Sequence, residues 1–346
     1  MKYTVNTEYL LDVFKKIIDT PSPVGFYTLL NPVLEKLASD IGYSVTYDNR
    51  KSMYITLDGE DNSKSVLIGA HADTLGFMVR KIDGSGTLRF RSLGGGNIHS
   101  FEGETVTVHT RDGRSYTGLI CCQSHSTHAF EDASTLARSE NTLMILLDER
   151  VKSKDDVLKL GIRPGDYVSV DPRTQITPNG YIKSRYIDDK GGVACCYEAL
   201  RYLKENNLKP KYRTIFVFPY TEEVGLGGCY VPEGVSEYAA LDIGLIGPEL
   251  DGDEYKVSIC AKDASAPYDY DLTNTLIDCA EKAGCDYAVD LFFRYGSDAH
   301  AAQRGGNDVA AAAFGMAVYC SHGMERTNVV GLENTVNLLL AYMLDR

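Results

Sequence analysis

The hydrophobic pattern of this chain changes character twice, and that change constrains the fold more than any other sequence feature. Before about residue 75 and after about residue 181, apolar runs alternate with helical patterns. Such alternation is typical of an α/β protein with a mostly parallel sheet and helices on both faces. In between, short alternating runs such as Thr105–His109 are separated by turn signals such as Asp112-Gly113. We therefore expect an α/β domain, residues 1–74 and 176–346, interrupted by a β-rich insertion, residues 75–175.

Periodicity within the α/β parts predicts individual elements. Apolar spacing near 3.6 predicts helices over Thr7–Asp19, Tyr27–Ile41, Asp189–Lys204, Leu272–Ala283 and Leu332–Leu344. Continuous apolar runs predict buried strands at Ser65–Ala70, Thr214–Phe218, Ala240–Ile246 and Val309–Phe314. Val45–Tyr47 and Met53–Leu57 are predicted to form a hairpin.

Composition argues against several classes of protein. The 48 acidic residues outnumber the 35 basic ones and give a formal charge of -13, so we expect no nucleic-acid partner. The apolar stretch Tyr9–Ile18 is broken by charges, and no uncharged run approaches the ~18 residues of a membrane span. We therefore expect neither a signal peptide nor a membrane partner. The nine cysteines, without a CxxC spacing, predict reduced and mostly buried thiols in a cytoplasmic protein.

Two polar clusters follow predicted strands, and ligands of α/β proteins bind beyond the carboxyl ends of strands. His71 and Asp73 follow Ser65–Ala70. They are either a metal ligand with its orienting carboxylate or an ordinary hydrogen-bonding pair. Glu222 and Glu223 follow Thr214–Phe218, where adjacent acids repel each other unless they are solvated or neutralised by a cation.

Further candidates lie along the second half of the chain. Asp188 and Asp189 begin a predicted helix, so one of them is expected to cap it and the other to act as a bridging carboxylate. Asp242 interrupts an apolar run and needs a partner, which a metal would supply. His322 follows Met316–Cys320 and is either a ligand or a capping residue.

Together these clusters contain two histidines and three carboxylates that suit two divalent metals sharing one carboxylate. The five residues are His71, Asp188, Glu223, Asp242 and His322. Imidazole ligands favour zinc or cobalt. Glu222 remains beside a ligand, where a general base for a metal-bound water would have to lie.

Seven motifs in order resemble the tetrahedral-particle (TET-type) metallo-aminopeptidases, which include glutamyl aminopeptidases and proteins called endoglucanases. The resemblance covers nearly the whole chain. The motifs are Gly69–Phe77, Tyr186–Gly192, Thr221–Gly228, Ala240–Ile243, Lys262-Asp263, Tyr295–Ala299 and Ser321–Thr327. It implies a phosphorylase/hydrolase-like α/β catalytic domain with an inserted β-barrel-like dimerisation domain. It also implies a homo-oligomer, as dimers or as twelve-subunit tetrahedral particles built from dimers.

The resemblance implies a division of the ligands between two metals. One metal would be held by His71, Asp188 and Asp242, and the other by Asp188, Glu223 and His322. By the same resemblance Glu222 is the general base, and Asp73 supports His71.

The sequence departs from the family pattern beside the ligands. Lys190 stands where the family often has Arg, Gly227 where it often has Arg, and Asn328 where it often has His. The spacing from Glu223 to Asp242 is slightly short for the family, so Glu249 is a reserve ligand.

The expected activity is metal-dependent hydrolysis of the N-terminal residue from short peptides. The alternatives are a related dinuclear amide hydrolase, such as a deacylase or carboxypeptidase, and a catalytically silent assembly subunit. A glycosidase would leave the histidines unexplained. Lys262, Arg294 and His300 form either an electropositive pocket for acidic side chains or ordinary surface charge. The preferred N-terminal residue, the physiological metal and the subunit count are left open.

Overall fold

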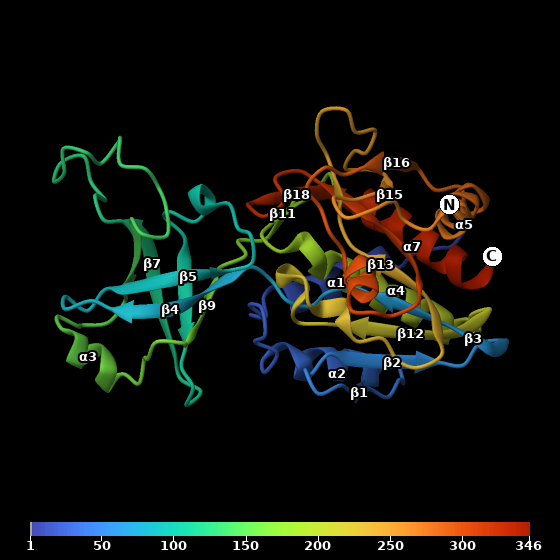
Figure 1. Ribbon diagram of the computed structural model, residues 1–346, viewed down its shortest axis with the longest axis horizontal. Coiled ribbons are helices and arrows are strands. Elements are labelled where there is room, and N and C mark those ends of the chain that lie inside the picture. Colours follow the sequence, from blue (N-terminus) through green and yellow to red (C-terminus); the bar gives the residue numbers. More distant parts are fainter. Residues whose placement is uncertain (1) are drawn as a thin grey trace. The chain divides into compact units, whose positions relative to one another are not determined.

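The computed structural model describes residues 2–346, and the chain divides into two compact units. Unit 1 comprises Met1–Asp73 and Arg173–Arg346, and unit 2 comprises Thr74–Pro172 (Figure 1). Unit 1 is α/β, and unit 2 is a closed β-barrel. The predicted fold class, an α/β domain with an inserted barrel-like domain, is confirmed.

The elements of unit 1 alternate as expected. Its first part contains α1 (Thr7–Ile18), α2 (Leu30–Asp40), β1 (Thr46–Tyr47), β2 (Met53–Leu57) and β3 (Asp61–Gly69). After unit 2 come β10 (Gln175–Ile176), β11 (Tyr181–Ser184), α4 (Ile187–Glu205), β12 (Tyr212–Phe218), the 3-10 turns η2 (Glu222–Val224) and η3 (Gly227–Cys229), β13 (Val235–Leu241) and β14 (Gly244–Leu245). The last part contains β15 (Val257–Lys262), α5 (Tyr270–Ala283), β16 (Tyr287–Leu291), α6 (Asp298–Arg304), β17 (Ala310–Val318), β18 (Glu325–Asn328) and α7 (Val329–Leu344).

A nine-stranded sheet forms the centre of unit 1, in the order β1-β2-β12-β3-β13-β17-β15-β16, with β14 paired to β17. The neighbours β12, β3, β13 and β17 are parallel to one another. The hairpin strands β1 and β2 and the strand β15 join this parallel centre through antiparallel pairings. Consequently the carboxyl ends of four adjacent strands lie along one edge of the sheet.

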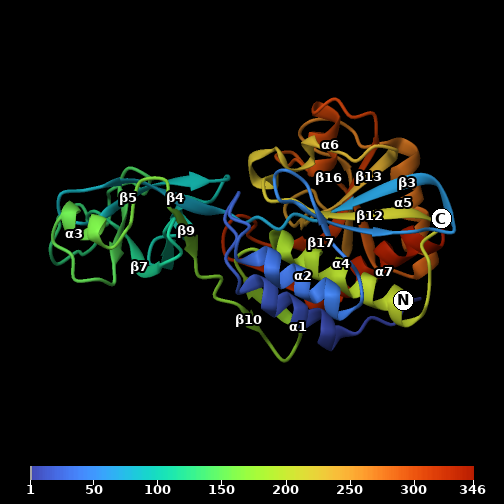
Figure 2. The ribbon, with the colours of Figure 1, turned by 90° about the horizontal axis from the view of Figure 1, so that it is seen from below.

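Helices cover both faces of this sheet, because alternate strand residues point to opposite sides and both sets are apolar. Figure 2 shows α6 on one side and α1 and α4 on the other. On the α6 side, Ala299 and Ala302 pack in one core with alternate strand residues such as Leu67, Tyr238 and Ala311.

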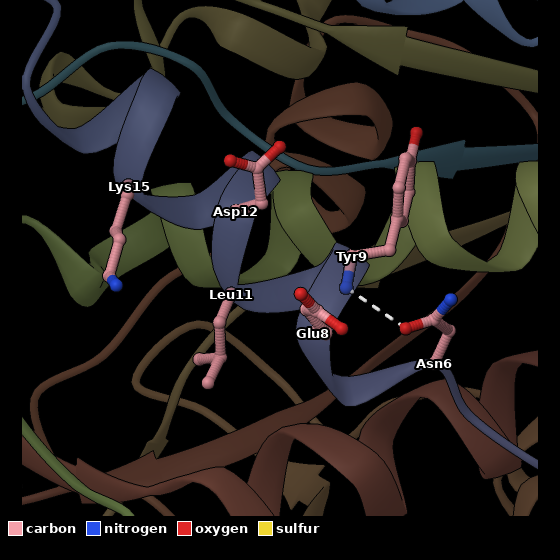
Figure 3. Close-up of a pocket in the computed structure, with 6 residues that line it drawn as sticks. All are labelled: Asn6, Glu8, Tyr9, Leu11, Asp12 and Lys15. Atoms are coloured by element: carbon pink, nitrogen blue, oxygen red, sulfur yellow. Dashed lines mark hydrogen bonds between the residues drawn. The ribbon is translucent and has the colours of Figure 1, made fainter.

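The helix α1 shows how local sequence fixes an element boundary. The Asn6 side chain accepts a hydrogen bond from the Tyr9 backbone N–H at 3.0 Å and caps the helix (Figure 3). Its apolar face, which includes Leu10 and Phe14, is buried, whereas its outer face lines a shallow hollow of about 510 Å³ with Asp12. Within residues 2–346, no helix is both long and apolar enough to span a bilayer.

Unit 2 closes a sheet on itself. It contains β4 (Gly76–Ile82), β5 (Leu88–Leu93), the 3-10 turn η1 (Ile98–Ser100), β6 (Thr105–His109), β7 (Ser115–Cys122), β8 (Leu143–Leu147), α3 (Lys154–Lys159) and β9 (Tyr167–Val170). The barrel order is β4-β5-β8-β7-β6-β9, and the pairings between these strands are antiparallel. Buried rings fill it, with Phe77 4.5 Å from Phe90 and 4.9 Å from Phe101 between ring centroids.

One predicted strand is corrected, and several short elements were not predicted. The run Ala240–Ile246 is not one strand: β13 ends at Leu241 and β14 begins at Gly244, so Asp242 lies in the break. The Asp242 Oδ1 atom accepts the Ile243 backbone N–H at 2.7 Å, which removes that donor from the strand ladder. The short elements β15, β16, α6 and β18 were not predicted, because none of them shows a long apolar run or helical repeat, and β18 is Glu-Arg-Thr-Asn. The nine cysteines are free thiols, and seven are buried, as predicted.

Candidate metal centre

The predicted site residues gather where the four parallel strands end. His71 follows β3, Glu222 and Glu223 lie in η2 beyond β12, Asp242 follows β13, and His322 lies beyond β17. Ligands of open α/β sheets bind at this edge because the loops after neighbouring strands converge there.

Asp188, at the start of α4, lies at the centre of the group. His71 Nε2 is 2.9 Å from Asp188 Oδ1, and His322 Nε2 is 3.5 Å from Asp188 Oδ2. His322 Nε2 is also 3.4 Å from Glu223 Oε2. His71, Asp188 and Glu223 each offer a ligand atom, and these atoms lie within 4.8 Å of one another. The two oxygens of Asp188 therefore face different imidazoles, the arrangement that a bridging carboxylate needs.

Asp73 orders the loops on either side of the group. Its buried carboxylate accepts the backbone N–H groups of Glu222 at 3.1 Å and Glu223 at 3.2 Å. His71 Nδ1 lies 3.0 Å from the Asp73 carbonyl oxygen, so a proton held on Nδ1 would leave Nε2 available to bind a cation shared with Asp188. Glu222 Oε2 is 3.9 Å from His71 Nε2, so this carboxylate lies beside the group.

Asp242 is buried, whereas the reserve candidate Glu249 is exposed in a loop. Burial first, and then the charge of Asp188, raise the pKa of Asp242 to about 7 against the opposing effect of His71. Asp242 therefore interacts electrostatically with Asp188 and His71.

The group carries more negative charge than its imidazoles offset. Burial raises the pKa of Glu223 to about 8, with a further contribution from the charge of Asp188. The pKa of Glu222 is well above its usual value, again through burial first and then through neighbouring acids such as Asp242. Burial alone would raise the pKa of Asp188, but hydrogen bonds with His322 and His71 hold it below its ordinary value. Cations bound here would relieve this repulsion, and the oxygen and imidazole donors fit them.

The two aspartates at the start of α4 differ in their surroundings. Both have non-helical backbone angles, and Tyr186 before them makes no side-chain hydrogen bond that caps the helix. The Gly192 backbone N–H acts on the Asp189 carboxyl three residues earlier, as on a capping aspartate, and opposes the rise in its pKa that burial causes. The local backbone turns Asp188 toward the histidines rather than toward the helix N–H groups.

Sequence reasoning gave no role to Glu325 and Asp298, although both lie in quoted motifs. Glu325 is buried, and its carboxylate accepts the backbone N–H groups of Asp188 and His322. Asp298 is also buried, and its charge helps to raise the pKa of Glu222, after the larger effects of burial and Asp242 and against the lowering effect of His71. The signal that the sequence offered was the position of each acid within one of the quoted motifs. The structure adds that both acids are buried, which is rare for an unpaired carboxylate.

Gly227, where the resembled family often has Arg, packs against Asp298. A Cβ atom on Gly227 would lie 2.4 Å from Asp298 Oδ1, and one on Gly228 would lie 1.9 Å from the Asp298 carbonyl oxygen. The loop after Glu223 can approach α6 this closely only because both residues lack side chains.

The three basic residues considered for an electropositive pocket have other partners. The buried His300 Nδ1 is 2.7 Å from Asp263 Oδ2, Lys262 Nζ donates to the Asp263 carbonyl oxygen at 2.7 Å, and the Arg294 guanidinium lies over Phe293. Lys190, another departure from the family pattern, is buried and donates to the Thr20 carbonyl oxygen at 2.6 Å.

Known proteins resemble this chain in sequence and in fold. The family model for the M42 glutamyl aminopeptidase matches residues 51–338. A Bacillus subtilis (strain 168) protein named "Putative aminopeptidase YhfE" is 38% identical over 96% of both chains. The glutamyl aminopeptidase of Lactococcus lactis subsp. cremoris (strain MG1363) is 25% identical over 64% of this chain and 62% of its own. The Pyrococcus horikoshii TET1 peptidase, described as able to assemble into a tetrahedron or a large octahedral shell, superposes with a TM-score of 0.84 at 25% identity, over 97% of this chain and 100% of its own. Since the family model spans most of its length, the chain belongs to the M42 glutamyl aminopeptidase family and is an aminopeptidase.

Proposed function

We propose that this aminopeptidase removes the N-terminal residue of short peptides with two divalent metal ions, zinc or cobalt. The observation that carries the proposal is Asp188 between the imidazoles of His71 and His322, with Glu223 beside it. When bound, the ions would lower the pKa of a water molecule and polarise the scissile carbonyl.

The contacts among the proposed ligands suggest how they would be divided between the two ions. We assign His71, Asp188 and Asp242 to one ion, and Asp188, Glu223 and His322 to the other. In support, His71 and His322 approach opposite oxygens of Asp188, and His322 also approaches Glu223. Asp242 is preferred to Glu249 because it is buried at a strand end.

Glu222 is proposed as the general base. Its backbone is fixed by Asp73, and its carboxylate lies 3.9 Å from His71 while remaining 15% exposed to solvent. It takes a proton from the attacking water as the water oxygen bonds to the carbonyl carbon. It then delivers that proton to the amine that leaves as the C–N bond breaks.

The first experiment is elemental analysis of the purified protein, with release of N-terminal residues from a peptide panel before and after chelation. We expect two ions per chain, loss of cleavage with chelator and recovery with zinc or cobalt. Glu222→Gln should keep both ions and lower turnover by about 10²–10⁴-fold. Glu249→Gln, an exposed control in the same unit, should change neither property.

Other outcomes identify the alternatives. Cleavage of N-acetylated peptides would point to a deacylase, because an aminopeptidase needs a free amine. Stoichiometric metal without cleavage of the panel would point to another amide substrate. Absence of both metal and cleavage would point to a silent assembly subunit.

We further propose that unit 2 is the dimerisation domain of a homo-oligomer, which would be a tetrahedral dodecamer if dimers associate further. In support, Leu119 on β7 and Leu146 on β8 are paired neighbours that are 40% and 37% exposed. Light scattering after chromatography should give a smaller particle for the double variant Leu119→Lys/Leu146→Lys. Leu208→Lys, at a leucine 41% exposed in unit 1, is the control and should leave the particle size unchanged.

A further inference from the structure

The geometry points to a positioning role for Glu325. We propose that its carboxylate holds the backbone at Asp188 and at His322 in one fixed geometry. It would thereby set the affinity of the ion assigned to Asp188, Glu223 and His322. This inference rests on the proposed two-ion function and adds to it a residue that touches no ion itself.

Glu325 uses its two oxygens on two different ligand segments. Oε2 accepts the backbone N–H of Asp188 at 3.0 Å, and Oε1 accepts the backbone N–H of His322 at 3.2 Å. The residue is 2% exposed, so water does not readily replace either bond. Asp188 and His322 are far apart in sequence, and this single carboxylate connects them.

The strands around Glu325 fix its position. In the antiparallel pairing of β11 and β18, Glu325 lies opposite Ser184, just before the turn that leads into Asp188. The Glu325 side chain therefore reaches Asp188 from a rigid, hydrogen-bonded neighbour. Outer groups that orient metal ligands are effective when they are held in this way.

His322 has a particular need for such support. Its φ of 63° lies in the left-handed region, which side-chain-bearing residues adopt reluctantly. The surrounding loop is closed by reciprocal backbone hydrogen bonds between Tyr319 and Arg326, at 2.9 and 3.1 Å. Within this loop, the bond from Glu325 to the His322 N–H restrains the residue that carries the imidazole. Losing it would let His322 relax away from Asp188 and Glu223.

Only one of the two proposed ions depends on both anchored residues. If Glu325 were altered, two of the three ligands of the ion held by Asp188, Glu223 and His322 would lose the hydrogen bond that holds their backbone. These two ligands are Asp188 and His322. The ion held by His71, Asp188 and Asp242 keeps its own support, because Asp73 accepts the η2 backbone and faces His71. The inference therefore predicts unequal effects on the two ions.

The test titrates metal-free full-length protein with Co²⁺, followed by visible absorption and by equilibrium dialysis. Glu325→Gln keeps the size of the side chain but replaces one acceptor with a donor that would face a backbone N–H. We expect it to weaken one class of Co²⁺ site about 10–100-fold, with a changed absorption spectrum, and to weaken the other class, which shares only Asp188, by a clearly smaller factor. The matched control is Glu254→Gln, because Glu254 is also buried but pairs with Arg326 at 2.9 Å.

The outcomes separate the hypotheses. Unchanged Co²⁺ affinities in Glu325→Gln, or equal weakening of both classes, would overturn the positioning role. The same selective loss in Glu254→Gln would also overturn it, since any disturbance near β18 would then suffice. If Glu325→Gln does not fold, Glu325→Asp is used, which keeps the charge but shortens the reach. It should weaken the same class more than the other, and no change would again overturn the role. Wild-type protein that binds fewer than two ions would instead contradict the proposed function.

Discussion

Unit 2 closes six strands around aromatic rings, whereas unit 1 leaves the ends of four parallel strands open to carboxylates and imidazoles. In the barrel, the strand side chains that face inward meet one another. In the α/β unit, the loops beyond the strands bring His71, Asp188 and Glu223 within 4.8 Å of one another. The same chain therefore contains one region built for packing and another that tolerates concentrated charge.

Their buried histidines illustrate this difference. His109 in the barrel lies 2.8 Å from the Ser169 hydroxyl, and burial lowers its pKa to about 4. His71 in the α/β unit lies 2.9 Å from the Asp188 carboxylate. A buried histidine with neutral partners stays neutral, whereas one beside carboxylates is suited to binding a cation with them. Predictions can test this contrast directly.

The largest expected effect comes from a glycine substitution in the α/β unit. Gly228→Ala would place a Cβ atom 1.9 Å from the Asp298 carbonyl oxygen, which is backbone and cannot rotate away. We expect a loss of about 3 kcal/mol in the free energy of unfolding, together with most of the peptidase activity. Gly103→Ala in the barrel meets nothing within 4 Å and should cost about 1 kcal/mol, through its φ of +87° alone. Equal losses in urea unfolding would refute the contrast.

The next effect concerns pH and belongs to the barrel. Because the folded pKa of His109 is about 4, the unfolded state binds more protons between about pH 6.5 and 4. The contribution of His109 to stability is therefore complete above pH 6.5 and is lost as the pH falls to 4, by about 3 kcal/mol at most. Hydrogen exchange of barrel peptides in the full chain, with chelator throughout, should show this loss in the wild type and not in His109→Gln. An unchanged pH dependence in the variant would show that other groups cause it.

Removal of bound ions by a chelator should affect unit 1 rather than the barrel. If ions neutralise the carboxylates of unit 1, their removal should raise hydrogen exchange in the loops around His71 and Glu222. An ion present at 100 times its Kd stabilises the folded state by about 2.7 kcal/mol. Exchange in the barrel peptides should remain unchanged, and uniform acceleration across both units would contradict this localisation.

The smallest effects should not distinguish the units at all. Lys36 and Asp40 form an exposed pair on α2, and Lys81 and Asp83 form a pair in the barrel unit. Because solvent screens such pairs, Asp40→Asn and Lys81→Gln should each change the free energy of unfolding by no more than about 0.5 kcal/mol. Thermal unfolding of the two variants would check this, and a large effect of either would mean that its side chain has an additional role.

Local sequence was a good guide to the elements that repeat a pattern over several turns. The helix predicted at Thr7–Asp19 is α1, and the strand predicted at Thr105–His109 is β6 with the same bounds. Prediction from local sequence failed where a polar contact interrupts the apolar pattern. At Asp242, for example, the side chain accepts a hydrogen bond from the Ile243 backbone N–H. Prediction failed too at β16, where exposed and buried residues alternate over only five positions.

The sequence by itself determined the α/β character of unit 1, the β-rich character of unit 2 and the residue types that suit a metal centre. Periodicity and composition are local properties, and a single chain displays them directly. Only the tertiary structure decided that the two oxygens of Asp188 face different histidines, and that Glu325 connects Asp188 with His322. These contacts depend on which strands are neighbours and on their register. Strand order and register come from pairings between distant segments, which no local pattern specifies.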